Sequence, residues 1–283
     1  MQSVLEILQK CSDYFGSKGI ETPKLDAEIL LAHALGCKRL ELFLRFEEPV
    51  PEDKLAPFRE MAKRRAKREP LQHIVGSVDF FGVTLKCDRR ALIPRHETET
   101  LCEIAATKLF PDQDAYIDIL DLGTGSGAIA LSLAAHFKNA DVDACDISEE
   151  AISLASENAK SLGLNANIFK SDWFENVAKT YDLILANPPY LTNEEVESAQ
   201  PEVRLFDPPQ ALASPDNGLK DIRKILADAS AKLKDGGAIV CECGLSQAKI
   251  LAEDAVKKYG FSAAETANDL SKRERFLICK KII

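Results

Sequence analysis

An alternating glycine motif, Gly123-Thr124-Gly125-Ser126-Gly127, follows the apolar run Asp118-Ile119-Leu120-Asp121-Leu122. The apolar run has the composition of a buried strand, and an Ala/Ile/Leu pattern that continues to about His136 is typical of a helix. A strand, a glycine turn and a helix form the opening unit of a doubly wound α/β sheet. Glycines let a ligand approach the main chain, and the helix amino terminus presents free N–H groups to it. The stretch therefore predicts a site for a nucleoside-bearing cofactor.

Acidic residues near this turn bear on which cofactor it holds. The spacing of Gly123, Gly125 and Ala128 also satisfies the loose dinucleotide fingerprint, so the glycines leave the cofactor open. Asp146 ends the next predicted strand, where a carboxylate can bind both hydroxyls of a ribose in either class of binder. Asp121, two residues before the first glycine, places a negative charge there. This charge repels a pyrophosphate and suits an ammonium group.

Two further polar segments come after predicted strands. In Ser171-Asp172-Trp173-Phe174, Asp172 offers a carboxylate to an adenine amino group and Trp173 offers an aromatic face. Ordinary core packing is the alternative role for this single tryptophan. Asn187-Pro188-Pro189-Tyr190 directly follows the fourth predicted strand. A proline-rich loop at a strand end is common, but an Asn followed by two prolines and an aromatic residue is much rarer and favours a functional role.

The elements that would position these segments alternate between strand and helix from about residue 95 onward, over the range 95–283. This alternation predicts an α/β fold with a doubly wound, mostly parallel seven-stranded sheet covered on both faces. Strands are expected at 117–122, 141–146, 166–170, 182–187, 237–243, 261–266 and 275–280. The last two are joined by a polar loop, so we expect one edge of the sheet to be antiparallel.

The amino-terminal part of the chain has a different pattern. Residues 1–72 contain four short amphipathic helical patterns, which predict a small, separate helical bundle. From Leu71 to Leu92 the pattern becomes extended around Gly82, and it predicts a connecting β-hairpin over 73–94. The basic run 63–68 at the end of the fourth helix is interpreted as a solvated face, with a phosphate contact on a ribonucleoprotein partner as the alternative.

The glycine turn, Asp146 and the Asn-Pro-Pro-Tyr segment together resemble S-adenosylmethionine-dependent methyltransferases that act on an exocyclic or amide NH₂ group. Asn-Pro-Pro-Tyr by itself is shared with adenine and guanine amino methyltransferases of DNA and RNA. Over essentially the whole chain, however, the sequence resembles the release-factor glutamine methyltransferases (the HemK-like or PrmC family). The segments that carry this resemblance, besides the helical amino-terminal region, are 68–76, 80–82, 93–99, 171–174, 202–204 and 273–275.

The resemblance implies transfer of a methyl group from S-adenosylmethionine to the side-chain amide nitrogen (N5) of the glutamine in the Gly-Gly-Gln motif of peptide-chain release factors. The implied cofactor-binding residues are Asp121, Gly123, Thr124, Gly125, Ser126, Gly127, Asp146, Asp172, Trp173 and Asn187. The alternative is a nucleic-acid amino methyltransferase that uses the same turn. By the same resemblance, the amino-terminal bundle and hairpin would dock the release factor.

The chemistry expected of the Asn-Pro-Pro-Tyr turn follows from its hydrogen-bonding groups. The Asn187 side-chain oxygen and the Pro188 main-chain carbonyl can accept the two N–H bonds of one amide. Pro188 and Pro189 fix the backbone and bring no competing N–H donor. Tyr190 would supply an aromatic wall for the amide or its aliphatic stem. A sulfonium is already a strong electrophile, so we expect no metal.

Two departures from the family pattern concern local shape. The family usually has proline where this chain has His96, which would loosen the entry to the following helix. The segment Ser214-Pro215-Asp216-Asn217-Gly218 is poorer in glycine than is usual. Neither departure removes a residue with an expected role in the chemistry.

Composition narrows the class of protein further. The formal net charge of −9 over 283 residues argues against a large nucleic-acid footprint. No apolar run has the length of a membrane span, and no secretion signal is visible at the amino terminus. The eight cysteines form no CxxC pair and the four histidines show no paired spacing, which favours buried free thiols in a reducing cytoplasm and no metal site. We therefore expect a cytoplasmic enzyme that is a monomer.

Overall fold

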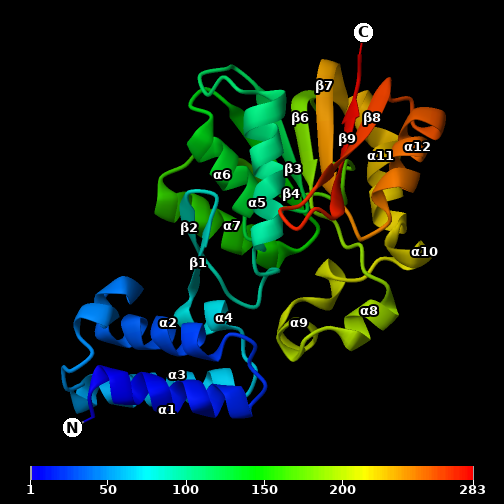
Figure 1. The fold of residues 1–283 in the computed structure, drawn as a ribbon. Helices are drawn as coiled ribbons and strands as arrows, with labels where there is room; N and C mark the ends of the chain where they lie inside the picture. The colour runs from blue at the N-terminus through cyan, green and yellow to red at the C-terminus, as the bar shows by residue number, and fades with distance from the viewer. Residues whose placement is uncertain (1, 283) are drawn as a thin grey trace. The chain divides into compact units, whose positions relative to one another are not determined.

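The computed structural model describes residues 2–282. The chain divides into two compact units (Figure 1). The first contains the residues up to Gly76 together with Gln200–Phe206, and the second contains Ser77–Ala199 and the chain from Asp207 onward. None of the helices in the described range is long and apolar enough to cross a membrane.

The first unit is helical. It contains α1 (Val4–Ser17), α2 (Pro23–Leu35), the 3₁₀ helix η1 (Arg39–Leu44), α3 (Glu52–Ala66), α4 (Leu71–Val75) and α9 (Pro201–Phe206). Ser3 caps α1 in a capping box with Glu6, and Gly36 ends α2 in the left-handed conformation. Phe15, Leu30 and other apolar side chains from these helices form a separate buried core.

The short helix α4 corrects the prediction of extended structure from Leu71. Pro70 stands at the amino-terminal cap of α4, and Gly76 ends it at a φ of 82°. The side chain of Ile74 is buried in the helical core. A single helical turn between a proline and a glycine therefore packs with the bundle, although its sequence is too short to show a helical period.

The basic run at the end of α3 is mostly paired with acidic residues. Arg65 is buried, and its guanidinium binds Asp26 at 2.6 Å and Glu202 at 2.8 Å. Arg68 binds the same Glu202 at 2.6 Å. The interpretation of the whole run as a solvated face is therefore wrong for Arg65, which holds α9 to the bundle.

The second unit is built on a seven-stranded sheet with the order β5-β4-β3-β6-β7-β9-β8. The strands are β3 (Asp118–Leu122), β4 (Asp141–Asp146), β5 (Asn167–Lys170), β6 (Tyr181–Ala186), β7 (Leu233–Glu242), β8 (Ala263–Asn268) and β9 (Glu274–Lys280). The first five are parallel, whereas β9 is antiparallel to both β7 and β8. The predicted doubly wound sheet with an antiparallel edge is confirmed.

Helices cover both faces of this sheet (Figure 1). On one face lie α5 (His96–Glu103), the π-helical turn η2 (Ile104–Leu109), α6 (Ala128–His136) and α7 (Glu149–Leu162). On the other lie α11 (Lys220–Lys232) and α12 (Ala248–Lys258). The segment between β6 and α11 also holds α8 (Asn193–Ser198), the 3₁₀ helix η3 (Pro209–Ala211) and α10 (Pro215–Gly218).

The predicted hairpin is present as β1 (Ser77–Phe80) and β2 (Val83–Lys86), which pair antiparallel. It belongs to the same unit as the sheet. Phe80 and Leu85 from the two hairpin strands are buried in the core that α5 and α6 share with the sheet.

Candidate active site

A cavity of about 500 Å³ lies at the carboxyl ends of β3, β4, β5 and β6. The segments that follow these four strands all contribute to its lining, and in open α/β sheets this is the edge at which ligands bind. The predicted site residues that line it are Gly123, Thr124, Gly125, Ser126, Asp146, Asp172, Trp173, Asn187 and Pro189. Its size suits a small organic cofactor together with part of a second substrate.

The glycine turn after β3 has backbone angles that favour glycine. The φ angles of Gly123, Gly125 and Gly127 are 71°, 57° and 83°. A Cβ atom at Gly123 would also lie 3.2 Å from the Trp173 ring, and one at Gly127 would lie 2.9 Å from Leu131. The turn is therefore shaped both by its own backbone and by the side chains packed against it.

Asp121 holds this turn together from beneath. Its Oδ2 accepts hydrogen bonds from Thr124 Oγ1 at 2.6 Å and from the Ala130 main-chain N–H at 3.2 Å. The side chain is fully buried and does not line the cavity, and its Oδ1 has no hydrogen-bond partner among the described residues. Burial raises the pKa of Asp121 to about 7, and the nearby charge of Asp146 adds to the effect.

Asp146 faces the cavity from the end of β4. Its Oδ2 accepts from the Gly125 N–H and its Oδ1 from the Ser148 N–H, both at 2.9 Å. Burial raises the pKa of this carboxyl, against the effect of these hydrogen bonds. The side chain is thus fixed beside the glycine turn, at the position expected for a ribose-binding carboxylate.

Asp172 and Trp173 both line the cavity after β5. Asp172 forms an ion pair with Lys224 of α11 at 2.7 Å. Trp173 has a φ of 50°, and its main-chain carbonyl accepts a hydrogen bond from Ser171 Oγ at 2.7 Å. The indole ring therefore forms part of the cavity wall as well as packing against the sheet core.

The catalytic turn predicted after β6 is held by a buried polar network. Asn187 Nδ2 donates to Thr98 Oγ1 at 3.1 Å, and Thr98 Oγ1 donates to Glu242 Oε2 at 2.8 Å. At the other end, the Tyr190 hydroxyl donates to Glu242 Oε1 at 2.9 Å and accepts from Arg275 Nη2 at 2.7 Å. Burial and the charge of Glu242 raise the pKa of Tyr190, which keeps its phenol protonated.

Four predicted site residues lie behind the cavity surface. Besides Asp121, these are Gly127, Pro188 and Tyr190, none of which lines the cavity. Pro188 is buried, and the hydroxyl of Tyr190 is engaged by Glu242 and Arg275. In this structure Tyr190 supports the turn from behind, and contacts of its ring and of the Pro188 carbonyl with the substrate stay predictions.

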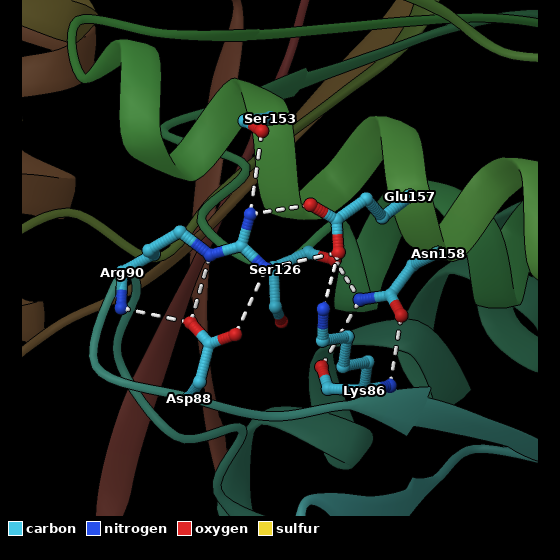
Figure 2. Close-up of polar contacts among 7 residues, drawn as sticks. All are labelled: Lys86, Asp88, Arg90, Ser126, Ser153, Glu157 and Asn158. Carbon is cyan, nitrogen blue, oxygen red and sulfur yellow. Dashed lines mark hydrogen bonds and ion pairs between the residues drawn. The ribbon is translucent and has the colours of Figure 1, made fainter.

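A second network joins the glycine turn to the hairpin and α7 (Figure 2). The buried Asn158 of α7 donates to the main-chain carbonyls of Ser126 and Lys86 at 2.9 and 3.2 Å, and it accepts from the Lys86 N–H at 2.8 Å. Arg90, which lines the cavity, binds Asp88 and Glu157 beside it. These contacts fix one wall of the cavity to the sheet domain.

Sequence reasoning missed Thr98, Glu242, Arg90 and Asn158. Glu242 could have been found, because it is a charged residue within the apolar strand predicted at 237–243. A buried carboxylate in such a strand needs polar partners. Thr98 and Asn158 carry no such signal, because their partners lie far away in the sequence. Arg90 binds the nearby Asp88, but its second partner, Glu157, is also distant in the sequence.

Comparisons with known proteins support one family. A model described as the PrmC N-terminal domain matches residues 6–76, and a model described as the methyltransferase small domain matches residues 104–266. A release factor glutamine methyltransferase of Rhodopirellula baltica is 35% identical over 99% of this chain and 96% of its own length. One from Deinococcus radiodurans is 38% identical over 98% of each chain. The chain belongs to the release factor glutamine methyltransferase family.

Solved structures show the same fold at lower identity. The 16S rRNA N2 G1207 methyltransferase of Thermus thermophilus, solved with AdoMet and guanosine, has a TM-score of 0.53 at 20% identity and covers 72% of this chain and 49% of its own. The hMettl16 catalytic domain has a TM-score of 0.57 at 16% identity, with 79% and 81% covered. The expected methyltransferase fold is confirmed.

Proposed function

We propose that this enzyme transfers a methyl group from S-adenosylmethionine to the side-chain amide nitrogen (N5) of the glutamine in the Gly-Gly-Gln motif of peptide-chain release factors. The observation that carries the proposal is the placement of Asn187. Its side chain lines the same cavity as the glycine turn and Asp146, with its amide nitrogen bound to Thr98. The names of the full-length relatives support the choice of substrate.

The residues around the cavity fit the cofactor. Asp146 would bind the ribose hydroxyls, and Asp172 with Trp173 would bind the adenine. The glycine turn leaves room that a Cβ atom at Gly123 would fill. Asp121 Oδ1 is buried beneath the turn without a hydrogen-bond partner among the described residues, and an ammonium group bound nearby would favour the ionised form of this carboxyl. When bound, the cofactor supplies an electrophilic methyl group.

The catalytic turn would orient the amide that accepts the methyl group. The lone pair of an amide nitrogen is shared with its carbonyl, so the nitrogen is a weak nucleophile. When Asn187 Oδ1 and the Pro188 carbonyl accept both N–H bonds, the nitrogen is held with its lone pair available. Held in this way, the nitrogen would face the methyl group that the bound cofactor would supply, and it would release one proton to water. Alignment of this kind is worth up to roughly 7–11 kcal/mol.

The Asn187→Ala variant tests this assignment. Turnover on a release factor, followed by mass spectrometry of the Gly-Gly-Gln glutamine, should fall to background, whereas the Kd for S-adenosylmethionine should change little. Asn139→Ala is the matched control, because Asn139 is exposed and, within residues 2–282, its side chain binds just the Asp114 carbonyl before β3. Normal turnover by Asn187→Ala would refute the assignment. Methylation of total RNA, with release factor untouched, would favour the nucleic-acid alternative.

The helical unit is proposed to dock the release factor. Leu40 and Leu44 of η1 are 69% and 87% exposed, and Phe43 between them is exposed as well, so this short helix presents a group of apolar side chains that suits a contact surface. Deleting residues 1–72 would leave Glu202 without its arginine partners, so substitution is the cleaner test. The double change Leu40→Ser and Leu44→Ser should raise KM for intact release factor and leave KM for the cofactor unchanged. Equal effects on the two constants would count against docking.

We propose further that the reaction takes place in the cytoplasm and that the enzyme is a monomer. Both the cofactor and release factors are cytoplasmic, which supports a cytoplasmic enzyme. The proposed active site is built from residues of a single chain, so a monomer suffices for the chemistry. Sedimentation of the purified protein should therefore give the mass of one chain, 31.1 kDa.

A further inference from the structure

The direction of the hydrogen bonds behind Asn187 is fixed by the chemistry of Glu242. Both carboxylate oxygens of Glu242 are engaged, Oε2 by Thr98 and Oε1 by Tyr190 and Arg275. Glu242 is 1% exposed, and Arg275 lies 3.1 Å away as its cation. A carboxylate in an ion pair only accepts hydrogen bonds. The single hydroxyl hydrogen of Thr98 must therefore point at Glu242.

This direction determines which end of the Asn187 amide meets Thr98. A threonine hydroxyl has one donor, and here that donor is already used. Toward Asn187, Thr98 Oγ1 can only accept, so it must be met by the Asn187 NH₂ group, at 3.1 Å. The Asn187 carbonyl oxygen is then the free end of the side chain, and it has no hydrogen-bond partner among the described residues.

We propose that Thr98 and Glu242 are positioning residues that hold the Asn187 amide with its oxygen toward the substrate. The inference rests on the proposed function, because it assumes that Asn187 accepts an N–H of the glutamine amide. Were the Asn187 amide turned over, its NH₂ would face the substrate NH₂, and two donors would oppose each other. Glu242 also binds Tyr190, so one buried carboxylate fixes the first and last residues of the turn.

The Thr98→Val variant tests the middle of the hydrogen-bond series that runs from Asn187 through Thr98 to Glu242. Valine keeps the shape of threonine but can neither donate nor accept a hydrogen bond, so the side chain at this position no longer fixes the orientation of the Asn187 amide. We expect kcat to fall on the order of 10- to 100-fold, the range for loss of a buried hydrogen bond, with KM for release factor changed less than about threefold. Thr98→Ser keeps the hydroxyl and should restore most of kcat.

The Glu242→Gln variant tests whether the Glu242 carboxylate sets the direction of these hydrogen bonds. A glutamine at this position can donate to Thr98, which frees the Thr98 hydroxyl to donate to Asn187 and removes the preference for one amide orientation. We expect kcat to fall as in Thr98→Val. Thr107→Val is the matched control, because Thr107 is exposed and its hydroxyl binds the Glu103 carbonyl within the same helical segment.

A readout besides activity separates positioning from loss of structure. The side-chain ¹⁵N–¹H₂ signals of Asn187, assigned by their disappearance in Asn187→Ala, should move in Thr98→Val and Glu242→Gln and return in Thr98→Ser. The Kd for S-adenosylmethionine should stay within about threefold of the wild-type value in all of these variants, which shows that the cavity is intact.

The outcomes distinguish this inference from the proposed function. If Asn187→Ala is inactive but Thr98→Val has the kcat of the wild type, the positioning role is overturned and the proposed function stands. The same holds if Thr98→Ser is as slow as Thr98→Val. If Asn187→Ala itself turns over normally, the proposed function fails, and the inference fails with it.

Discussion

The indole ring of Trp173 packs against Gly123 so closely that a Cβ atom at Gly123 would lie 3.2 Å from the ring carbon Cζ3. Both residues line the cavity, and they come from the ends of two strands that are separated in the sheet by β4. The glycine turn and the Trp173 ring are therefore packed in direct contact and form one continuous part of the cavity wall. A change on either side alters the space between them.

Replacing Gly123 with alanine should weaken cofactor binding. The methyl group would press on the Trp173 ring, and a φ of 71° is unfavourable for alanine. We expect the Kd for S-adenosylmethionine, measured by titration calorimetry, to rise at least tenfold. Gly163→Ala is the matched control, because Gly163 has a φ of 67° but a Cβ atom added there would meet nothing within 4 Å. If both variants bind the cofactor equally well, the fit between Gly123 and Trp173 is unimportant.

Asp121 should make stability depend on pH. Its pKa is about 7 in the folded protein against a reference value of 3.8, so well below pH 3.8 the carboxyl is protonated in both states and costs nothing. As the pH rises from 4 to 7 the unfolded chain ionises first, and stability falls; above pH 7 the cost is constant. Asp121→Asn should therefore be more stable than wild type above pH 7, by up to about 4 kcal/mol, and nearly equal to it at about pH 3.

The measurement is urea denaturation of both proteins at several pH values. A stability difference that does not change with pH would contradict the raised pKa. The same variant also tests the ammonium role, because loss of the charge should raise the Kd for S-adenosylmethionine. An unchanged Kd would leave Asp121 with the structural task of holding Thr124 and the start of α6.

Most of the fold could be predicted because strands and helices carry local signals. The strand at 118–122 and the glycines after it are visible as an apolar run and a turn motif, and the structure places them as expected. The helix at 71–75 could not be predicted, since it is one turn long and is formed by packing with the bundle. The grouping of Gln200–Phe206 with the bundle likewise depends on ion pairs across more than 130 residues.

The site was predictable in part for the same reason. Residues directly after strands, such as Asp146 and Asn187, could be assigned to the cavity because parallel strands end at one edge. Whether a side chain faces the cavity or supports it from behind is decided by tertiary packing. Tyr190 illustrates the difference: its aromatic character suggests a substrate wall, but its hydroxyl is bound by Glu242.

The Arg65 network should be important for the stability of the helical unit. Arg65→Met removes the cation between two carboxylates and leaves the buried Asp26 without an ion-pair partner. Removing one partner of a buried pair typically costs about 3–5 kcal/mol, which urea denaturation would detect. The exposed pair of Lys63 and Glu60 provides the control, and Lys63→Met should have little effect. Similar losses in the two variants would contradict this distinction.

Asn158 should couple stability to the shape of the cavity. Asn158→Ala would leave two main-chain groups of Lys86 and the carbonyl of Ser126 without their partner (Figure 2). The bond to the Ser126 carbonyl is buried, and an unsatisfied buried group costs about 1–3 kcal/mol, so the free energy of unfolding should fall by about that amount. Lys86 is exposed, so water can replace its two bonds to Asn158. Because Ser126 lines the cavity, the Kd for S-adenosylmethionine should rise as well.

The neighbouring Glu157 gives the comparison that makes this last prediction specific. Glu157 binds Arg90 and Lys86 at the surface of the same helix, one residue before Asn158. Exposed ion pairs of this kind contribute little to stability, so Glu157→Ala should unfold at nearly the wild-type urea concentration and retain its affinity for the cofactor. Parallel denaturation and binding curves for the two variants decide the question. If Glu157→Ala is the more damaging change, the wall of the cavity is held by surface charge and not by the buried amide.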